Sequence, residues 1–174
     1  KNLLNKGLSK LSVQKDQFYK YAQVDPYQQE TQWSCSAACL KAVLEHYGVS
    51  IREEECVEAI GARPNRGAEV TEIAEAARKL GFEAFHYTFD SLDQAGALLS
   101  CDVPIICDIQ SFNHPGKGHY VVLVSADAES VHLMDPNTPG NQRALSREEM
   151  DDRWWDHAME APHVLMTKWG VVVL

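Results

Sequence analysis

The chain has 174 residues, of which 45% are hydrophobic, so it can bury one ordinary core and we expect one main domain. Its formal net charge of -9 at pH 7 argues against nucleic acid as the main partner. The sequence has no run of eighteen apolar residues, so it predicts no transmembrane helix and no stable membrane insertion.

The first 24 residues differ from the rest in charge. Five lysines stand against one aspartate within residues 1–20, and the leucines there form a narrow apolar face that Gly7 interrupts. A membrane-seeking helix is one interpretation, but a connector from an upstream region fits the pattern better. We assign residues 1–24 to a basic lead-in or linker segment and residues 25–174 to the main domain. Because the first residue is Lys1, we expect that the chain was processed or cut from a longer protein.

The first half of the main domain reads as mostly helical. Apolar residues at helical spacing predict a helix over residues 35–47, and Gly48 is typical of its end. Two further helices are expected over residues 52–61 and 71–81, each closing on a glycine. A strand over residues 82–89 follows, and then a short helix over residues 91–100 that Asp90 or Ser91 caps.

The second half turns to β-structure. Strands are expected over residues 103–110, 119–125, 130–135 and 163–174. One helix intervenes over residues 146–155, where Ser146 and Glu149 have the spacing of a capping box. Helices that come first, followed by consecutive strands, indicate an α+β fold with a largely antiparallel sheet.

The five cysteines cannot all pair within one chain, and no CxxC motif occurs. Their mostly apolar neighbours favour free thiols in a reducing compartment. Cys35 and Cys39 have no histidine pair nearby at zinc-finger spacing, so we expect neither a metal nor another cofactor.

Cys35 has the sequence position of a reactive thiol. It follows a polar stretch and begins the predicted helix, where free N–H groups and the positive end of the helix dipole stabilise a thiolate. Cys39 lies one turn deeper, and we interpret it as a packing residue.

A base and its orienting acid are found in the predicted hairpin of residues 119–135. His119 opens one strand and Asp135 closes the next. If the turn is centred near Asp127, these two residues stand directly opposite each other and share a face. A register slip of one residue would separate them. Either residue alone is more commonly structural, but together with Cys35 they indicate a catalytic group. Glycines at 116 and 118 would allow close approach of a substrate backbone.

Gln29 is a candidate for the oxyanion hole. Its side-chain amide, six residues before Cys35, can stabilise the oxygen of a tetrahedral intermediate together with the Cys35 backbone N–H. Gln28 and Gln32 are close enough in sequence that residue spacing leaves them open as alternatives.

These blocks resemble a known family. The pattern Q-x5-CSAACLKAVL-x-HYG, followed by GHYVVLV, VHLMDPN and LSREEMDDRW, is similar to the bacteriocin-processing, double-glycine cysteine peptidases of the papain-like group. The resemblance implies a helical part with the catalytic cysteine at a helix N-terminus, packed on a mainly antiparallel sheet. It also implies Cys35 as nucleophile, His119 as general base, Asp135 as orienting acid and Gln29 as oxyanion-hole residue.

The chain departs from the family pattern at two positions. Ser34 stands where the family commonly has aspartate, and Ser36 where glycine is frequent. Neither change removes a catalytic group, although both could alter the substrate channel. The reaction implied by the resemblance is hydrolysis of a protein or peptide substrate after a Gly-Gly motif.

Two bacterial settings fit this chemistry. The long basic lead-in favours a C-terminal toxin (effector) domain that acts in the reducing cytoplasm of a rival cell and is blocked by an immunity protein. The alternative is leader-peptide processing for a bacteriocin exporter. Glutamine deamidation or transglutamination on the same triad, and a binding module without catalysis, also stay open.

Overall fold

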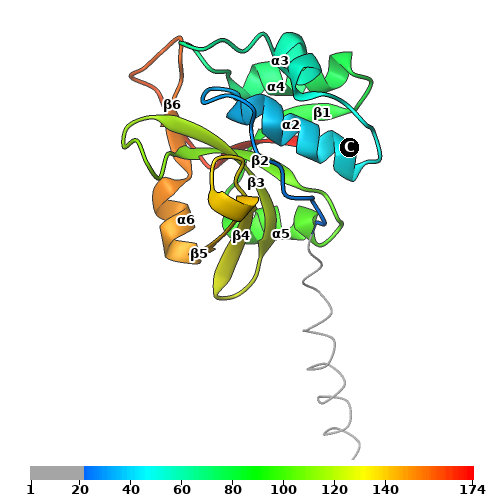
Figure 1. Cartoon of the computed structure of the whole chain (residues 1–174). Coiled ribbons are helices and arrows are strands. Elements are labelled where there is room, and N and C mark those ends of the chain that lie inside the picture. The colour runs from blue at the N-terminus through cyan, green and yellow to red at the C-terminus, as the bar shows by residue number, and fades with distance from the viewer. Residues whose placement is uncertain (1–21) are drawn as a thin grey trace, which may run out of the picture.

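The computed structural model describes residues 22–174, and a six-stranded antiparallel sheet forms its centre (Figure 1). The strands follow the order β1-β8-β2-β3-β4-β5, and β6 and β7 form a separate two-stranded sheet. The strand bounds are β1 Ala84–Thr88, β2 Ile105–Gln110, β3 Gly118–Ala126, β4 Ser130–Met134, β5 Gln142–Ser146, β6 Trp155–His157, β7 Leu165–Thr167 and β8 Trp169–Val173.

Helices cover both faces of the central sheet (Figure 1). One face packs against three helices, and α5 and α6 lie on the other side. The helix bounds are α2 Cys35–His46, α3 Glu53–Ile60, α4 Val70–Lys79, α5 Leu92–Leu99 and α6 Arg147–Arg153, with a 3-10 turn η1 at Pro139–Asn141. The predicted mixture of helices with an antiparallel sheet is thus confirmed.

The core is split by the sheet into two layers, because successive side chains of a strand point to opposite faces. Ile106 and Val122 belong to the layer beneath α2, α3 and α4, whereas Ile105 and Leu123 belong to the layer beneath α5 and α6. The central strands are therefore buried on both sides, which explains their continuous apolar runs.

Residues that the sequence predicts to cap or end helices do so in α3, α5 and α6. The C-cap of α3 is Gly61 in the left-handed conformation, with φ +77°. Ser91, rather than Asp90, caps α5 by accepting a hydrogen bond from the Gln94 N–H. At α6, Ser146 and Glu149 each accept a hydrogen bond from the other's backbone N–H, as a capping box requires.

The C-terminal part differs from prediction. The expected single strand over residues 163–174 is two strands, β7 and β8, because Lys168 between them has a positive φ of 50°. The helix expected over residues 146–155 ends at Arg153, and Trp155 starts β6 instead. The short strands β5 and β6 were not predicted from the sequence.

The register of the β3–β4 hairpin corrects a prediction that concerns the site. Val122 pairs with Met134, so Asp135 comes level with Val121 and not, as expected, with His119. Nearer the turn, Ala126 pairs with Val131, which is a register one residue different. A β-bulge at Val124 accounts for this difference of one residue between the two registers. The backbone carbonyl of Val124 accepts a hydrogen bond from the Ala22 N–H at 2.9 Å.

The bulge decides which face the two candidate residues share. His119 lies two positions along β3 from Val121, and a displacement of two keeps it on the same face as Asp135. If the register at the turn continued along both strands without the bulge, His119 would lie three positions from the residue opposite Asp135. The two residues would then be on opposite faces of the sheet. His119 and Asp135 are therefore neighbours, as predicted, but they occupy diagonal and not directly opposed positions of the hairpin.

Residues 1–21, most of the predicted basic lead-in segment, lie outside the described residues. The described part starts at Ala22, which is buried in the layer beneath α5 and α6. Among residues 22–174, the helices are all too short or too polar to cross a bilayer.

Candidate active site

Cys35 is the first residue of α2, as predicted, and its side chain is half-buried. The helix N-cap is Ser34, whose side chain makes no capping hydrogen bond to the helix. Cys39, one turn further, is fully buried in the core, and burial raises the pKa of its thiol well above the usual value. The two thiols are therefore in different environments, and only Cys35 lines a cleft. All five cysteines are free.

The loop before α2 positions Gln29. Its backbone N–H donates to the carbonyl of Pro136 at 3.0 Å, which ties it directly to the residue after Asp135. On the other side, the Glu30 N–H donates to the buried carboxylate of Glu53 at 3.0 and 3.2 Å. The loop is thus fixed both to the end of β4 and to α3.

The Gln29 side chain is buried and lines the same cleft as Cys35. Its Nε2 donates one hydrogen to the carbonyl of Thr31 at 2.6 Å, which leaves the second amide hydrogen for another acceptor. The hydroxyl of Ser34 donates to the same Thr31 carbonyl, so Ser34 helps to shape this turn. Gln28, one alternative, is exposed and accepts a hydrogen bond from Asn141.

His119 and Asp135 form a buried hydrogen-bonded pair. The Nε2 of His119 lies 2.8 Å from the Oδ1 of Asp135, and both residues are more than nine-tenths buried. The same Oδ1 accepts a hydrogen bond from the Asn137 N–H at 3.0 Å. Because Nε2 is used by Asp135, the Nδ1 of the ring is left for a partner on the other side.

The pKa of His119 reflects this environment. Burial alone would lower the pKa of the imidazole, but its hydrogen bonds to Asp135 and Cys35 and the charges of both groups raise it to about 9. Burial opposes the ionised form of Asp135 too, yet the hydrogen bonds from His119, Asn137 and Arg143 keep the pKa of Asp135 below its usual value. The pair therefore favours an imidazolium beside a carboxylate at neutral pH.

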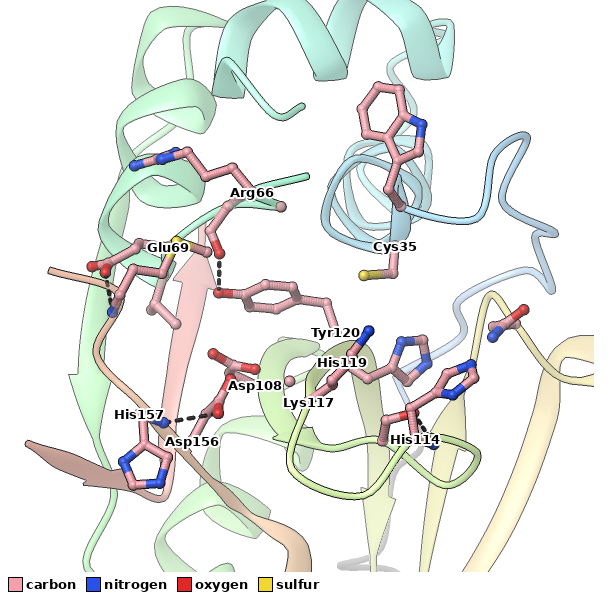
Figure 2. A pocket seen from close by; sticks show the side chains of 18 of the residues that line it. Cys35, Arg66, Glu69, Asp108, His114, Lys117, His119, Tyr120, Asp156 and His157 are labelled. Carbon is pink, nitrogen blue, oxygen red and sulfur yellow. Dashed lines mark hydrogen bonds between the residues drawn. The ribbon is translucent and has the colours of Figure 1, made fainter. Parts of the chain in front are cut away.

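The candidate residues meet in a cleft of about 1070 Å³. Figure 2 shows the Cys35 sulfur entering it from the helix above, while His119 comes from the strand below. Apolar side chains, among them Trp33 and Trp169, also line the cleft together with several charged groups. Cys35, His119 and Gln29 thus face one cavity, and Asp135 supports His119 from behind.

A second group of acids occupies the far part of this cleft (Figure 2). A Cβ built on Gly118 would lie 1.9 Å from Asp156 Oδ2 and 3.1 Å from Asp108 Oδ1. Burial and the neighbouring Asp156 raise the pKa of Asp108 well above its usual value, and burial raises the pKa of Asp156. Gly118 therefore makes room for the protein's own Asp156, whereas the sequence had suggested room for a substrate backbone.

Arg143 is a neighbour of the site that the sequence did not reveal. Its Nε donates to Asp135 Oδ2 at 3.1 Å, and its guanidinium carbon lies 3.8 Å from the centre of the Phe112 ring. Arg143 belongs to β5, where it pairs with Leu133 of β4. Because β5 was not predicted, nothing in the residue spacing placed Arg143 beside Asp135.

The geometry provides a thiol, an imidazole and a carboxylate in sequence, with an amide donor in the same cleft. In chemical terms this set can attack a carbonyl carbon, move a proton and stabilise an oxyanion. The structure brings all four predicted residues to one place, and their roles in a reaction remain predictions.

A sequence profile of the Peptidase C39 family matches residues 23–162. Among curated proteins, the chain is 27% identical over 128 residues to the lactococcin-G-processing and transport ATP-binding protein of Lactococcus lactis subsp. lactis. That match covers 74% of this chain but 17% of the relative, so the chain spans only a small part of the transporter's length.

Solved structures share the fold at low sequence identity. A double glycine motif protease from an AMS/PCAT transporter, solved in complex with the leader peptide, superposes with a TM-score of 0.68 at 20% identity, over 88% of this chain and 93% of that one. The peptidase domain of Streptococcus ComA gives 0.65 at 21% identity, over 87% and 98%. A C39-like peptidase from Bacillus anthracis gives 0.69 at 16% identity, over 90% and 97%.

Proposed function

Because this chain belongs to the peptidase C39 family of cysteine peptidases, we propose that it cleaves a protein or peptide substrate after a Gly-Gly pair, with Cys35 as the nucleophile. The observation that carries the proposal is the buried pair of His119 and Asp135, 2.8 Å apart, in the cleft that Cys35 enters. This is the order of groups that a thiol nucleophile needs: a base beside it and an acid that orients the base.

In the proposed first step, the Cys35 thiolate attacks the carbonyl carbon of the scissile peptide bond. The C–S bond forms as the carbonyl π electrons move to the oxygen. Gln29 Nε2 and the Cys35 backbone N–H donate hydrogen bonds to this oxyanion. When the oxyanion collapses, the C–N bond breaks, and protonated His119 gives its proton to the leaving amine.

In the second step, neutral His119 takes a proton from water, and the hydroxide attacks the thioester. The C–S bond then breaks and releases the new carboxylic acid, which gives its proton to solvent, together with the Cys35 thiolate, while His119 is again protonated. Throughout, Asp135 holds Nε2 and stabilises the imidazolium without itself taking the proton.

Two observations support Gly-Gly as the cleavage site. The chain belongs to a family in which one structural relative is described as a double glycine motif protease bound to a leader peptide. In addition, the cleft around Cys35 is lined by bulky side chains, including Trp33 and Trp169. Residues without side chains at the two positions before the cut would fit beside such walls with the least steric conflict.

A peptide assay tests this function. Wild-type protein should cut a peptide that carries Gly-Gly, and should cut poorly when both glycines are replaced by leucine. Cys35→Ala should be inactive, and Cys101→Ala serves as the matched control because Cys101 is an exposed thiol in the turn after α5. Efficient cleavage of the Leu-Leu peptide would refute the specificity, and full activity of Cys35→Ala would refute the nucleophile.

The biological setting is a finer proposal: a toxin domain that acts on proteins of a rival bacterial cell and is blocked by an immunity protein. The net charge of -9 would suit a basic blocking partner. Profiling of new N-termini in bacteria that express wild type or Cys35→Ala tests it. Cuts in cellular proteins together with growth arrest would support an effector, whereas cuts confined to amphipathic leader peptides would support leader processing. A one-dalton mass shift without a cut would indicate deamidation instead.

A further inference from the structure

The carboxylate of Asp135 has a different partner on each oxygen. Oδ1 accepts hydrogen bonds from His119 Nε2 at 2.8 Å and from the Asn137 N–H at 3.0 Å, whereas Oδ2 accepts one from Arg143 Nε at 3.1 Å. Rotation of the carboxylate about its Cβ–Cγ bond would therefore break bonds on both sides. Arg143 is the side-chain donor that holds the oxygen turned away from the imidazole.

Arg143 is itself held in place from several directions. Its Nη2 donates to the hydroxyl of Thr138, and its guanidinium carbon stacks on the ring of Phe112 at 3.8 Å. The side chain is 27% exposed, so it is largely shielded from solvent. The guanidinium, which β5 carries, thus contacts two further segments: the turn after β4 and the loop after β2.

From these contacts we propose that Arg143 is a positioning residue of the candidate active site. It fixes the Asp135 carboxylate in the orientation that hydrogen-bonds His119, and it offsets part of the negative charge that the imidazole experiences. This inference rests on the proposed function and deepens it, because it adds to the thiol, imidazole and carboxylate a permanent cation on the far side of the acid.

The charge effect has a definite sign. The titratable groups that interact with His119 include Cys35 from α2, Asp135 after β4 and Asp108 from β2. Arg143 disfavours the protonated imidazole, because its positive charge lies against the same Asp135 carboxylate and partly neutralises it. If Arg143 is replaced by a neutral residue, Asp135 keeps both hydrogen bonds to Oδ1, and its full charge then faces His119. The imidazolium should therefore become more stable and lose its proton at higher pH.

The experiment is an NMR titration of the His119 ring, carried out in a Cys35→Ala background so that it does not depend on activity. Addition of Arg143→Met should raise the pKa of His119 by about half a unit to one unit. Arg143→Lys keeps the charge and should leave the pKa close to that of the parent. Arg147→Met is the matched control, since Arg147 is 28% exposed and pairs with Asp93 instead.

Kinetics on the chain with Cys35 intact give the second readout. Arg143→Met should lower kcat on the order of tenfold with little change in KM, because a more stable imidazolium gives its proton less readily to the leaving amine, whereas Arg143 does not line the cleft. Arg143→Lys should recover part of that loss. If Arg143→Met does not fold, Arg143→Gln replaces it, as its amide can still donate to Asp135 or Thr138.

A His119 pKa that is unchanged or lower in a folded, neutral Arg143 variant would overturn the proposal. So would a fall in activity that the Arg147→Met control shares. The titration also separates this inference from the proposed function: a raised pKa in an inactive protein would retain Arg143 as a positioning residue while rejecting the peptidase activity.

Discussion

Replacement of Gly118 by alanine should damage the site through Asp156 and not through the backbone. The new Cβ would lie 1.9 Å from Asp156 Oδ2, which is far inside van der Waals contact, so the carboxyl group must move. Asp156 Oδ1 now accepts hydrogen bonds from the Gln110 side chain at 3.2 Å and from the His157 N–H at 2.8 Å. Displacement of Asp156 strains or breaks both of these bonds.

The expected destabilisation follows from these contacts. Loss of one or two hydrogen bonds, with some overpacking beside β6, costs about 1–3 kcal/mol. For a domain of this size, that lowers Tm by roughly 2–12 °C, which a thermal melt detects readily. Because Gly118 directly precedes His119, the peptidase activity should fall as well.

A double-mutant cycle identifies the cause. Asp156→Ala removes the two nearest atoms and leaves only Asp108 Oδ1 at 3.1 Å, so Gly118→Ala should cost much less in that background. Gly116→Ala is the control: Gly116 has a positive φ of 81° but open space at its Cβ position, and it should cost about 1 kcal/mol through backbone strain alone. If Gly118→Ala is equally destabilising with and without Asp156, the steric explanation is wrong.

Further predictions concern three of the proposed site residues and Cys39. In the peptide assay, His119→Ala should abolish cleavage, whereas Asp135→Asn should leave measurable activity because Asp135 orients the base and transfers no proton. Gln29→Ala should lower kcat by roughly 10²–10³ through loss of an oxyanion donor, as steady-state kinetics would report. The pKa of His119 is raised from 6.5 to about 9, so the ion pair that it forms should persist through neutral pH, and kcat/KM should decline as the pH rises through about 9. Cys39→Ser should cost about 1–3 kcal/mol of stability in a denaturant titration, because it buries a hydroxyl among apolar groups, and it should spare the chemistry of Cys35.

The helical half of the fold was predictable because its signals are local. Apolar residues at helical spacing and terminal glycines placed α2, α3 and α4 to within a few residues. The helix start at Cys35 followed from the same local pattern, and so did the capping box at α6.

The remainder depends on contacts between distant segments. β5 and β6 are short and lack a strong alternation, so only their pairing partners identify them as strands. The break at Lys168 depends on a positive φ at a residue type that rarely adopts one. Arg143 was not predicted as a neighbour of Asp135 for the same reason, since its distance from Asp135 is set by the pairing of β4 with β5.

The closeness of the candidate site residues was predictable from the sequence, but their detailed geometry was not. Cys35, His119 and Asp135 were found because three chemically suitable residues occur at element ends. Their register was wrong mainly because the turn is centred between Ala128 and Glu129 and not near Asp127, as the pairing of Ala126 with Val131 shows. The bulge at Val124 then changes the register by one residue, and a bulge leaves no reliable mark in a single sequence. The likeness to a known family made the selection of Gln29 over its neighbours possible, and its burial in the cleft supports that selection.

The bulge at Val124 restricts how this hairpin can be redesigned. A loop transplanted between β3 and β4, or a peptide tag inserted there, can be absorbed if all added residues bulge outward as loop. If instead a single residue is inserted into one strand, every side chain of that strand beyond the insertion changes face. The His119 imidazole and the Asp135 carboxylate would then no longer lie on the same face. Engineers should therefore treat the span from Val124 to Asp135 as a unit and build variable loops elsewhere.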